Sequence, residues 1–202
     1  MSDNIKALSE FKKLMNEADS IEHLTLTEAR MRETYFSCFD SILHADGFKF
    51  ERRSRRPSKN EVNAMISFGN TILYGYIADV IQKTDLDIRI AFLHSANRRS
   101  QSLNLDIAEL FKPVIVDRLI FSLTNKHIIV ANKHFTANDD GSVLLNREGK
   151  SVFISAFKDK LSQKIDVKGE KLSYAQLISR EVWNLRGYIL QGDKYTPFKC
   201  GW

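Results

Sequence analysis

The sequence predicts a mainly α-helical fold, in which residues 1–202 form a single helical domain with one small β-hairpin. Three observations support this prediction. A chain of 202 residues is long enough for one ordinary domain and too short for three. It has 43% hydrophobic residues, including 13 Phe, but only 9 Gly and 3 Pro, so material for a core is ample and helix breakers are few. Apolar residues also recur at steps of three and four over most of the chain.

Two helices are expected near the start of the chain. Apolar residues at helical spacing predict a short amphipathic helix over residues 3–17. A second helical period covers residues 31–42, with Thr25 or Thr27 as the expected N-cap and Gly47 beyond the end.

A basic run and a long helix follow. Residues 52–59 read Arg-Arg-Ser-Arg-Arg-Pro-Ser-Lys, which places five cations in eight positions. Ser58 and Glu61 have the spacing of a capping box, and they predict the start of a helix that continues to about Thr84. Two glycines inside this helix lower its intrinsic stability, which indicates close approach by a neighbouring helix or by DNA.

The middle of the chain is less regular. Residues 87–94 alternate weakly between polar and apolar types and favour an extended segment. The helical pattern resumes over residues 103–112. Pro113 comes next and suits the first turn of a further helix over residues 114–123.

The last third combines a hairpin with two helices. Residues 128–130 and 143–145 are β-prone, and Asp-Asp-Gly at 139–141 provides a turn between them. Helices are expected over residues 150–164 and 173–190, and the tail is expected to be coil.

Charge and cysteine content restrict the class of protein. Thirty basic and 25 acidic residues give a net charge of +5, concentrated in the basic run and at Arg98 and Arg99. These clusters are candidate phosphate contacts, with a solvated loop or a partner-docking patch as the alternative. Cys38 and Cys200 are too few for a disulfide framework or a zinc site. Without a signal peptide or an apolar run of about 18 residues, we expect a cytoplasmic protein that has no membrane partner.

Four residues are candidates for chemistry. Glu28 continues the apolar stripe of the second helix, and burial of an unpaired carboxylate is costly unless a cation meets it. Asp106 and Glu109 are three residues apart and share one face of a helix. With His94, these carboxylates suit Mg²⁺ or Mn²⁺. When these residues are considered without any family resemblance, a metal site is the less common interpretation. A histidine in this position more often packs or caps a helix, and an acidic pair at this spacing more often lies on a solvated face. The usual motifs for nucleotide hydrolysis, dinucleotide binding and serine hydrolysis are absent from the sequence.

A longer pattern connects these residues. The run Arg55–Gly75 resembles the signature of the CRISPR spacer-acquisition integrase, the first-numbered Cas protein. Ala91-Phe92-Leu93-His94 resembles the Gly-Phe-Leu-His of that family. Leu103–Phe111 resembles its Ser-Leu-x-x-Asp-Leu-x-Glu-x-Phe, and Pro113–Arg118 resembles its Arg-Pro-x-x-Val-Asp-Arg. Upstream, Thr27-Glu28-Ala29-Arg30 lies where the family has Gly-x-Glu-Gly, and the resemblance extends from about residue 5 to the end of the chain.

The resemblance implies a helical catalytic domain that inserts short duplex prespacers into a CRISPR repeat array by transesterification, with a 3′-hydroxyl as the attacking group. It implies Glu28, His94 and Glu109 as ligands of Mg²⁺ or Mn²⁺, and Asp106 as a nearby catalytic helper. For Asn63 and Tyr74, a structural role as satisfied core residues is an equal alternative to contact with DNA. The residues expected to contact DNA are Arg52, Arg53, Arg55, Arg56, Lys59, Asn63, Tyr74, Arg98 and Arg99.

The resemblance also bears on partners. The family usually has an N-terminal β-domain that docks the second-numbered Cas protein, whereas this chain begins almost at the first helix of the catalytic domain. We therefore expect a compact integrase, similar to those of type V-C systems, that is encoded by a prokaryote or phage. It would act as a dimer or tetramer of itself, without the second-numbered protein, although a piece of a longer chain is the alternative. The alternative functions are a structure-specific or transposon-type endonuclease and a non-catalytic DNA-binding subunit.

Overall fold

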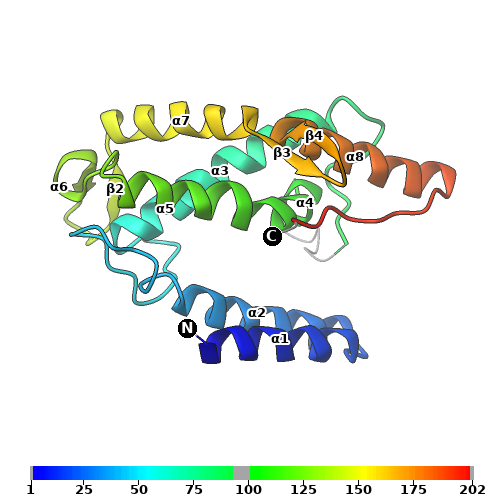
Figure 1. Ribbon diagram of the computed structural model, residues 1–202, viewed down its shortest axis with the longest axis horizontal. Coiled ribbons are helices and arrows are strands. Elements are labelled where there is room, and N and C mark those ends of the chain that lie inside the picture. Colours follow the sequence, from blue (N-terminus) through cyan, green and yellow to red (C-terminus); the bar gives the residue numbers. More distant parts are fainter. Residues whose placement is uncertain (1, 93–100, 201–202) are drawn as a thin grey trace. The chain divides into compact units, whose positions relative to one another are not determined.

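The computed structural model describes residues 2–92 and 101–200 and confirms a mainly α-helical fold, in which the described residues also form four short strands (Figure 1). The chain divides into two compact units, and each is discontinuous in sequence. Three helices contain the boundaries, which fall after residues 65, 120 and 149, and these helices run from one unit into the other. The first unit comprises residues 1–65 and 121–149, and the second comprises residues 66–120 and 150–202.

The first unit begins with two antiparallel helices that lie side by side, α1 (Ser2–Asn16) and α2 (Ile21–Ser37) (Figure 1). The helix predicted over residues 3–17 is confirmed by α1. The second predicted helix is present as α2, but it starts at Ile21, before the expected caps at Thr25 or Thr27, and ends at Ser37 instead of residue 42.

The early start of α2 has a local cause. Ser20 is the N-cap, and its hydroxyl accepts a hydrogen bond from the His23 amide at 3.1 Å. Thr25 and Thr27 are therefore not caps, and that prediction is wrong. Both lie inside the helix, where their hydroxyls donate to carbonyls one turn earlier at 2.8 and 2.9 Å.

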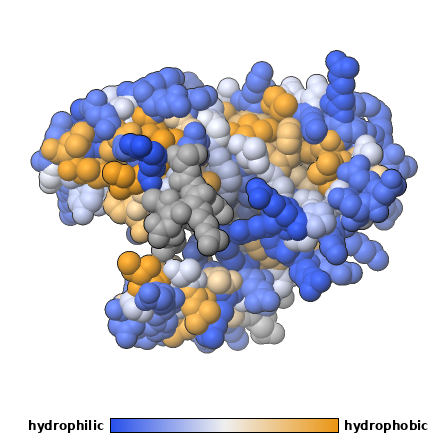
Figure 2. All heavy atoms as spheres, turned by 180° about the vertical axis from the view of Figure 1, so that it is seen from behind, coloured by the Kyte–Doolittle hydropathy of each residue, from blue (hydrophilic) through white to orange (hydrophobic). Residues whose placement is uncertain are grey.

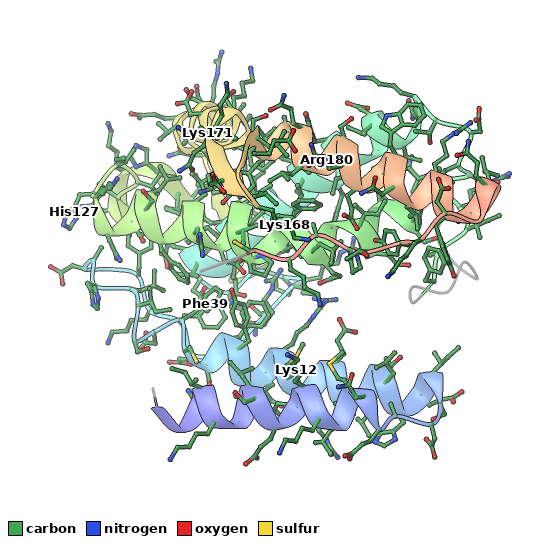
Figure 3. The ribbon with its side chains drawn as sticks, turned by 45° about the vertical axis from the view of Figure 1, so that its right-hand side comes forward. Lys12, Phe39, His127, Lys168, Lys171 and Arg180 are labelled. Carbon is green, nitrogen blue, oxygen red and sulfur yellow. The ribbon has the colours of Figure 1, made fainter. Side chains whose placement is uncertain are left out.

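An aromatic cluster follows the end of α2. Phe39 is 1% exposed and stands at its centre (Figure 3). Four rings surround it with centroid separations of 4.8 to 5.3 Å, which are suited to edge-to-face and tilted packing. This cluster anchors the irregular chain between α2 and the basic run. The four rings belong to Tyr35, Phe36, Phe50 and Phe121.

The first unit also contains the predicted hairpin, with a different first strand. The predicted strand β2 (Val143–Leu145) pairs antiparallel with β1 (Phe135–Ala137), which follows a short helix, α6 (Ala131–His134). Residues 128–130 are not a strand. The amides of Ile128 and Ile129 instead donate to the Leu123 carbonyl and close the preceding helix.

The predicted long helix is present as α3 (Glu61–Ile81), but it begins two residues later than a cap at Ser58 requires and ends before Thr84. Ser58 does not cap it, contrary to the prediction. Asn60 does so, because its Oδ1 accepts a hydrogen bond from the Asn63 amide at 2.8 Å. Within the described residues, α3 alone is long and apolar enough to cross a membrane, although half of that stretch is buried inside the protein, as in a core helix.

The predicted helices on either side of Pro113 are joined by an irregular turn. Helix α4 (Leu103–Phe111) leads into a π-helical turn, η2 (Lys112–Asp117), and then into α5 (Arg118–Asn125). Proline lacks an amide hydrogen and cannot continue the regular ladder, which accounts for a wider turn at this point.

Two helices of the second unit confirm the predictions for residues 150–164 and 173–190. They are α7 (Arg147–Ser162) and α8 (Tyr174–Gln191), and α8 begins with a capping box formed by Ser173 and Gln176. The face drawn in Figure 2 carries many hydrophilic residues, with hydrophobic residues between them. The exposed apolar residues of α8 are Trp183, Tyr188, Ile189 and Leu190.

A second hairpin, which the sequence analysis did not predict, separates α7 from α8. Strands β3 (Lys164–Val167) and β4 (Glu170–Ser173) pair antiparallel around a two-residue turn. Lys168 and Gly169 both have positive φ, 56° and 87°, which matches the favoured twist of such turns. Figure 3 labels Lys168 and Lys171 on this hairpin.

Candidate functional site

Glu28 lies on α2 and is mostly buried, in accord with its predicted position on an apolar stripe. Its side chain is 19% exposed, and its Oε1 accepts a hydrogen bond from the Arg32 guanidinium at 2.8 Å. Arg32 follows one helical turn later. A carboxylate withdrawn from water requires a compensating positive charge, and Arg32 supplies it.

Glu109 on α4 has a similar arrangement. Its side chain is 24% exposed and forms an ion pair with Lys112, which is 13% exposed and follows three residues later. The Lys112 ammonium also lies 4.9 Å from the centre of the Tyr74 ring, in a cation–π contact. The predicted DNA contact Tyr74 is therefore connected to the predicted metal ligand Glu109 through Lys112.

The donor chemistry of the predicted ligands fits a hard divalent cation. Two carboxylates and one imidazole are ligands that Mg²⁺ or Mn²⁺ accepts, and both carboxylates are already paired with a cation. Glu28 belongs to the first unit and Glu109 to the second, whereas His94 lies outside the described residues. Among residues 2–92 and 101–200 there is no group of three His, Cys, Asp or Glu side chains that could hold a metal ion. Convergence of the three ligands stays a prediction.

Asp106 contacts the segment that precedes His94 in the sequence. Its Oδ2 accepts a hydrogen bond from the Phe92 amide at 2.6 Å. The segment itself is not the extended strand that the sequence favours, because residues 87–92 contain a turn in which the Ile90 amide donates to the Asp87 carbonyl. Asp87 also pairs with Arg89, which lowers the pKa of Asp87 to about 2.

Two of the residues expected to contact DNA hold the basic run together by hydrogen bonds within the protein, and their contact with DNA stays a prediction. Asn63 is 1% exposed, and its Oδ1 accepts hydrogen bonds from the Arg53 guanidinium at 2.8 Å and the Ser54 amide at 3.0 Å. Its Nδ2 donates to the Arg52 carbonyl at 2.9 Å. The Arg53 guanidinium also donates to the Ser54 carbonyl, so it is directed at the protein's own backbone. Asn63 has the structural role that the sequence left open.

The other cations of the run have a different setting. Arg52, Arg55, Arg56 and Lys59 are exposed, and the buried Asn63 holds the backbone that carries them. Their side chains can therefore reach a phosphate backbone at little desolvation cost. The second predicted cluster, Arg98 and Arg99, lies outside the described residues.

Asn104 is a further polar residue near Tyr74 that the sequence analysis did not consider. It is 3% exposed, and its Nδ2 donates to the Tyr74 carbonyl at 3.1 Å. Arg32 and Lys112 were also missed, although helical spacing gave a signal: each follows a candidate carboxylate by four or three residues. The two carboxylates were predicted as ligands of a divalent ion, whereas the basic residues one turn later on the same helices were not predicted as their partners.

Comparison with known proteins relates the chain to one family. Residues 1–159 match the family described as CRISPR associated protein Cas1. The curated "CRISPR-associated endonuclease Cas1 2" of Thermodesulfovibrio yellowstonii is 38% identical over 100% of this chain and 61% of its own length. The solved structure of a Cas1 protein from Thermotoga maritima is 40% identical, with a TM-score of 0.84 over 92% of this chain and 57% of that one.

Two more distant structures share the fold. A casposase bound to integration product has a TM-score of 0.83 and 20% identity, covering 93% of this chain and 56% of that one. A Cas6-RT-Cas1–Cas2 complex has a TM-score of 0.83 and 19% identity, covering 95% of this chain and 21% of that one. The chain spans about three fifths of the length of the curated relatives that it matches.

Proposed function

The chain belongs to the Cas1 family of CRISPR-associated proteins, and from this premise we propose that it is a divalent-metal-dependent DNA integrase. The reaction is insertion of a short duplex prespacer into a CRISPR repeat array by 3′-hydroxyl transesterification. The observation that carries the proposal is the family match, and it is supported by two mostly buried carboxylates, Glu28 and Glu109, which the sequence resemblance implies as ligands. Metal dependence and strand transfer are parts of this proposal.

The proposed roles follow from the chemistry of each side chain. Glu28, His94 and Glu109 would hold Mg²⁺ or Mn²⁺. Such an ion, when bound, would supply Lewis-acid chemistry that lowers the pKa of the attacking hydroxyl and offsets charge on the scissile phosphate. Arg32 and Lys112 orient the two carboxylates through the ion pairs described above.

DNA binding is assigned to the exposed cations of the basic run, which are Arg52, Arg55, Arg56 and Lys59. They contact phosphates and contribute affinity with little sequence information. Arg98 and Arg99, which follow His94 closely in sequence, are proposed as phosphate contacts nearer the reacting bond. The partly exposed Arg53 and the buried Asn63 support the backbone of the run through their hydrogen bonds.

The proposed partners are prespacer and repeat DNA and further copies of the chain, in the prokaryotic cytoplasm. The sequence analysis also expects that no second-numbered Cas protein takes part. That expectation is corrected, because the similar Cas6-RT-Cas1–Cas2 assembly contains Cas2 together with a Cas1 of the same fold.

An integration assay tests the proposal. Purified protein is incubated with a short duplex, a supercoiled repeat plasmid and Mn²⁺, and the junctions are sequenced. We expect prespacer ends joined to plasmid strands at repeat borders, and a duplex with blocked 3′ ends should give no joined product. Absence of joined product with an unblocked duplex would overturn the integrase proposal.

A metal-dependent DNA endonuclease is the second candidate, favoured by the word endonuclease in the names of the relatives. The same groups would then direct water at the phosphodiester. Nicked plasmid or cut branched DNA in the absence of any prespacer would support this candidate.

A further inference from the structure

The tail that follows α8 turns back toward the helix that it leaves. Gly192, the C-cap of α8, has a φ of 75°, in the left-handed region that suits glycine. The Asp193 amide then donates to the Gly187 carbonyl at 3.3 Å. A Cβ at Gly187 would lie 2.5 Å from Asp193 Oδ2, so the tail packs closely on this turn of α8. Figure 1 draws the tail in red, and it runs from the end of α8 back toward α4.

Glu181 of α8 holds the returning tail. Its side chain is buried, and the residue is 2% exposed. One carboxylate oxygen, Oε1, accepts a hydrogen bond from the Tyr195 hydroxyl, and Oε2 accepts one from the Phe198 amide at 2.9 Å. A buried carboxylate is costly unless hydrogen bonds satisfy it, and the tail supplies two. Burial and the carboxylate of Glu181 raise the pKa of Tyr195, so its hydroxyl keeps the proton that it donates.

The same tail contacts the end of α4. The Phe198 ring stacks on the Phe111 ring, with the two centroids 5.1 Å apart and an interplanar angle of 7°. Phe111 is 0% exposed and is the last residue of α4, where the helix widens into η2. Glu109 lies two residues before it, and Lys112, which pairs with Glu109, follows it directly. The ring contact therefore reaches the part of α4 that carries a predicted metal ligand.

We propose that Glu181 and Phe198 are positioning residues, which use the tail to fix the end of α4 that carries Glu109. This inference rests on the proposed integrase function. The helices α4 and α8 and the tail all belong to the second unit. Glu181 fixes the backbone of Phe198, and the Phe198 ring in turn packs on Phe111. Because a ligand has to be held within about 0.5 Å of its productive position, release of this ring should disturb the Glu109 carboxylate.

Variants of Glu181 separate an action of its charge from an action of its contacts. Glu181→Gln removes the charge. It keeps both contacts, because the amide oxygen of glutamine can accept from the Phe198 amide and its NH₂ group can donate to the Tyr195 hydroxyl, which accepts as well as donates. Glu181→Ala removes both contacts. Phe198→Ala removes the stacked ring and leaves the backbone amide in place.

The test compares Glu181→Gln, Glu181→Ala and Phe198→Ala with wild type. Amide exchange at residue 198 and over residues 108–112 reports whether the tail is held and whether it orders α4. Strand transfer measured against Mn²⁺ concentration reports the consequence for the reaction, and a titration of labelled duplex reports binding. Thr196→Ala is the matched control, because Thr196 is an exposed residue of the same tail. Circular dichroism establishes that each variant is folded.

We expect Glu181→Gln and the control to stay within about threefold of wild type in every measurement, since both keep the two contacts. In Glu181→Ala and Phe198→Ala, the amides of residues 108–112 should exchange at least about tenfold faster. Strand transfer should fall at least about tenfold, because a misplacement near 1 Å can cost about a hundredfold. Phe198→Ala keeps the proposal testable if Glu181→Ala does not fold.

The Mn²⁺ dependence distinguishes positioning from general stability. In Phe198→Ala, the Mn²⁺ concentration that gives half-maximal strand transfer should rise at least about threefold, because a proposed ligand is displaced. Duplex binding should stay within about threefold, because the basic run carries it. A merely structural role would lower the amount of active protein without changing that Mn²⁺ concentration.

Three results would overturn the inference. Unchanged exchange over residues 108–112 in Phe198→Ala would show that the tail does not order α4. Faster exchange with unchanged strand transfer would show that this order does not serve the reaction. A Glu181→Gln variant as inactive as Glu181→Ala, with a protected Phe198 amide, would show that the charge of Glu181 is what matters. If the wild-type chain gives no strand transfer, the proposed function fails, and amide exchange still decides whether the tail fixes α4.

Discussion

Glu28 and His94 define the first prediction at the scale of single residues. Glu28→Ala and His94→Ala should each abolish strand transfer, because each removes a proposed metal ligand, yet leave duplex binding within a few fold. Binding is carried by the exposed basic run, which neither change touches. Junction sequencing and a titration of labelled duplex measure the two properties. Wild-type integration by either variant contradicts the ligand assignment.

Asn63 gives a second prediction at this scale. Asn63→Ala removes three hydrogen bonds in a buried setting, and at about 0.5 to 1.5 kcal/mol each the free energy of unfolding should fall by about 1.5 to 4.5 kcal/mol. Urea denaturation measures the loss, and the exposed helix residue Thr71→Ala is the control. If Asn63→Ala left the free energy of unfolding unchanged but weakened DNA binding, Asn63 would be a DNA contact and not a structural residue.

At the scale of elements, the two glycines of α3 are predicted to respond oppositely to alanine. A Cβ at Gly69 would lie 2.7 Å from Val116 Cγ1 and 2.9 Å from Phe153 Cζ, whereas nothing lies within 4 Å of a Cβ at Gly75. Gly69→Ala should destabilise the protein by about 1 to 3 kcal/mol through overpacking. Gly75→Ala should stabilise it by about 0.5 to 1 kcal/mol through helix propensity. Thermal unfolding measures both changes in stability. If Gly69→Ala and Gly75→Ala changed the stability equally, Val116 and Phe153 would not pack tightly against Gly69.

The basic run is the second element with a measurable consequence. Neutralising Arg55 and Arg56 together should weaken binding to unrelated duplexes about equally. The slope of log affinity against log salt should become shallower by about 2, because each phosphate contact releases about 0.9 counterion. Lys168→Gln with Lys171→Gln, on the β3–β4 hairpin, removes the same charge and serves as the control (Figure 3). An unchanged slope would mean that these arginines face a protein partner.

At the scale of the whole molecule, we predict a homo-oligomer, because two-ended integration needs two active sites and each chain supplies one. Helices α1 and α8 are the expected interface elements, and both expose apolar side chains, including Ile5 and Leu14 on α1 and Ile189 and Leu190 on α8. Ile189→Lys with Leu190→Lys should shift the mass in light scattering toward the monomer. One chain per duplex under conditions that give two-ended integration would contradict the prediction.

The sequence by itself determined most of the helices and the family, and it named the candidate ligands, whose role stays a prediction. Helical periodicity is a local property, set by residues three and four apart, so α1, α7 and α8 could be found without any tertiary contact. Caps and strand partners were predicted less well, because several serines, threonines and β-branched residues compete for each place. Ser20 and Asn60 took the roles assigned to Thr25 and Ser58.

Only the tertiary structure decided between neighbours of the same type. Arg53 is directed toward Asn63 while Arg55 and Arg56 are exposed, and Gly69 faces Phe153 while Gly75 faces open space. The sequence presents each pair as equivalent, because their local propensities are the same. The members of each set differ in their tertiary contacts: Arg53 meets the buried Asn63, and Gly69 meets the packed ring of Phe153. These contacts join residues ten and more than eighty positions apart, so local propensity and spacing do not reveal them.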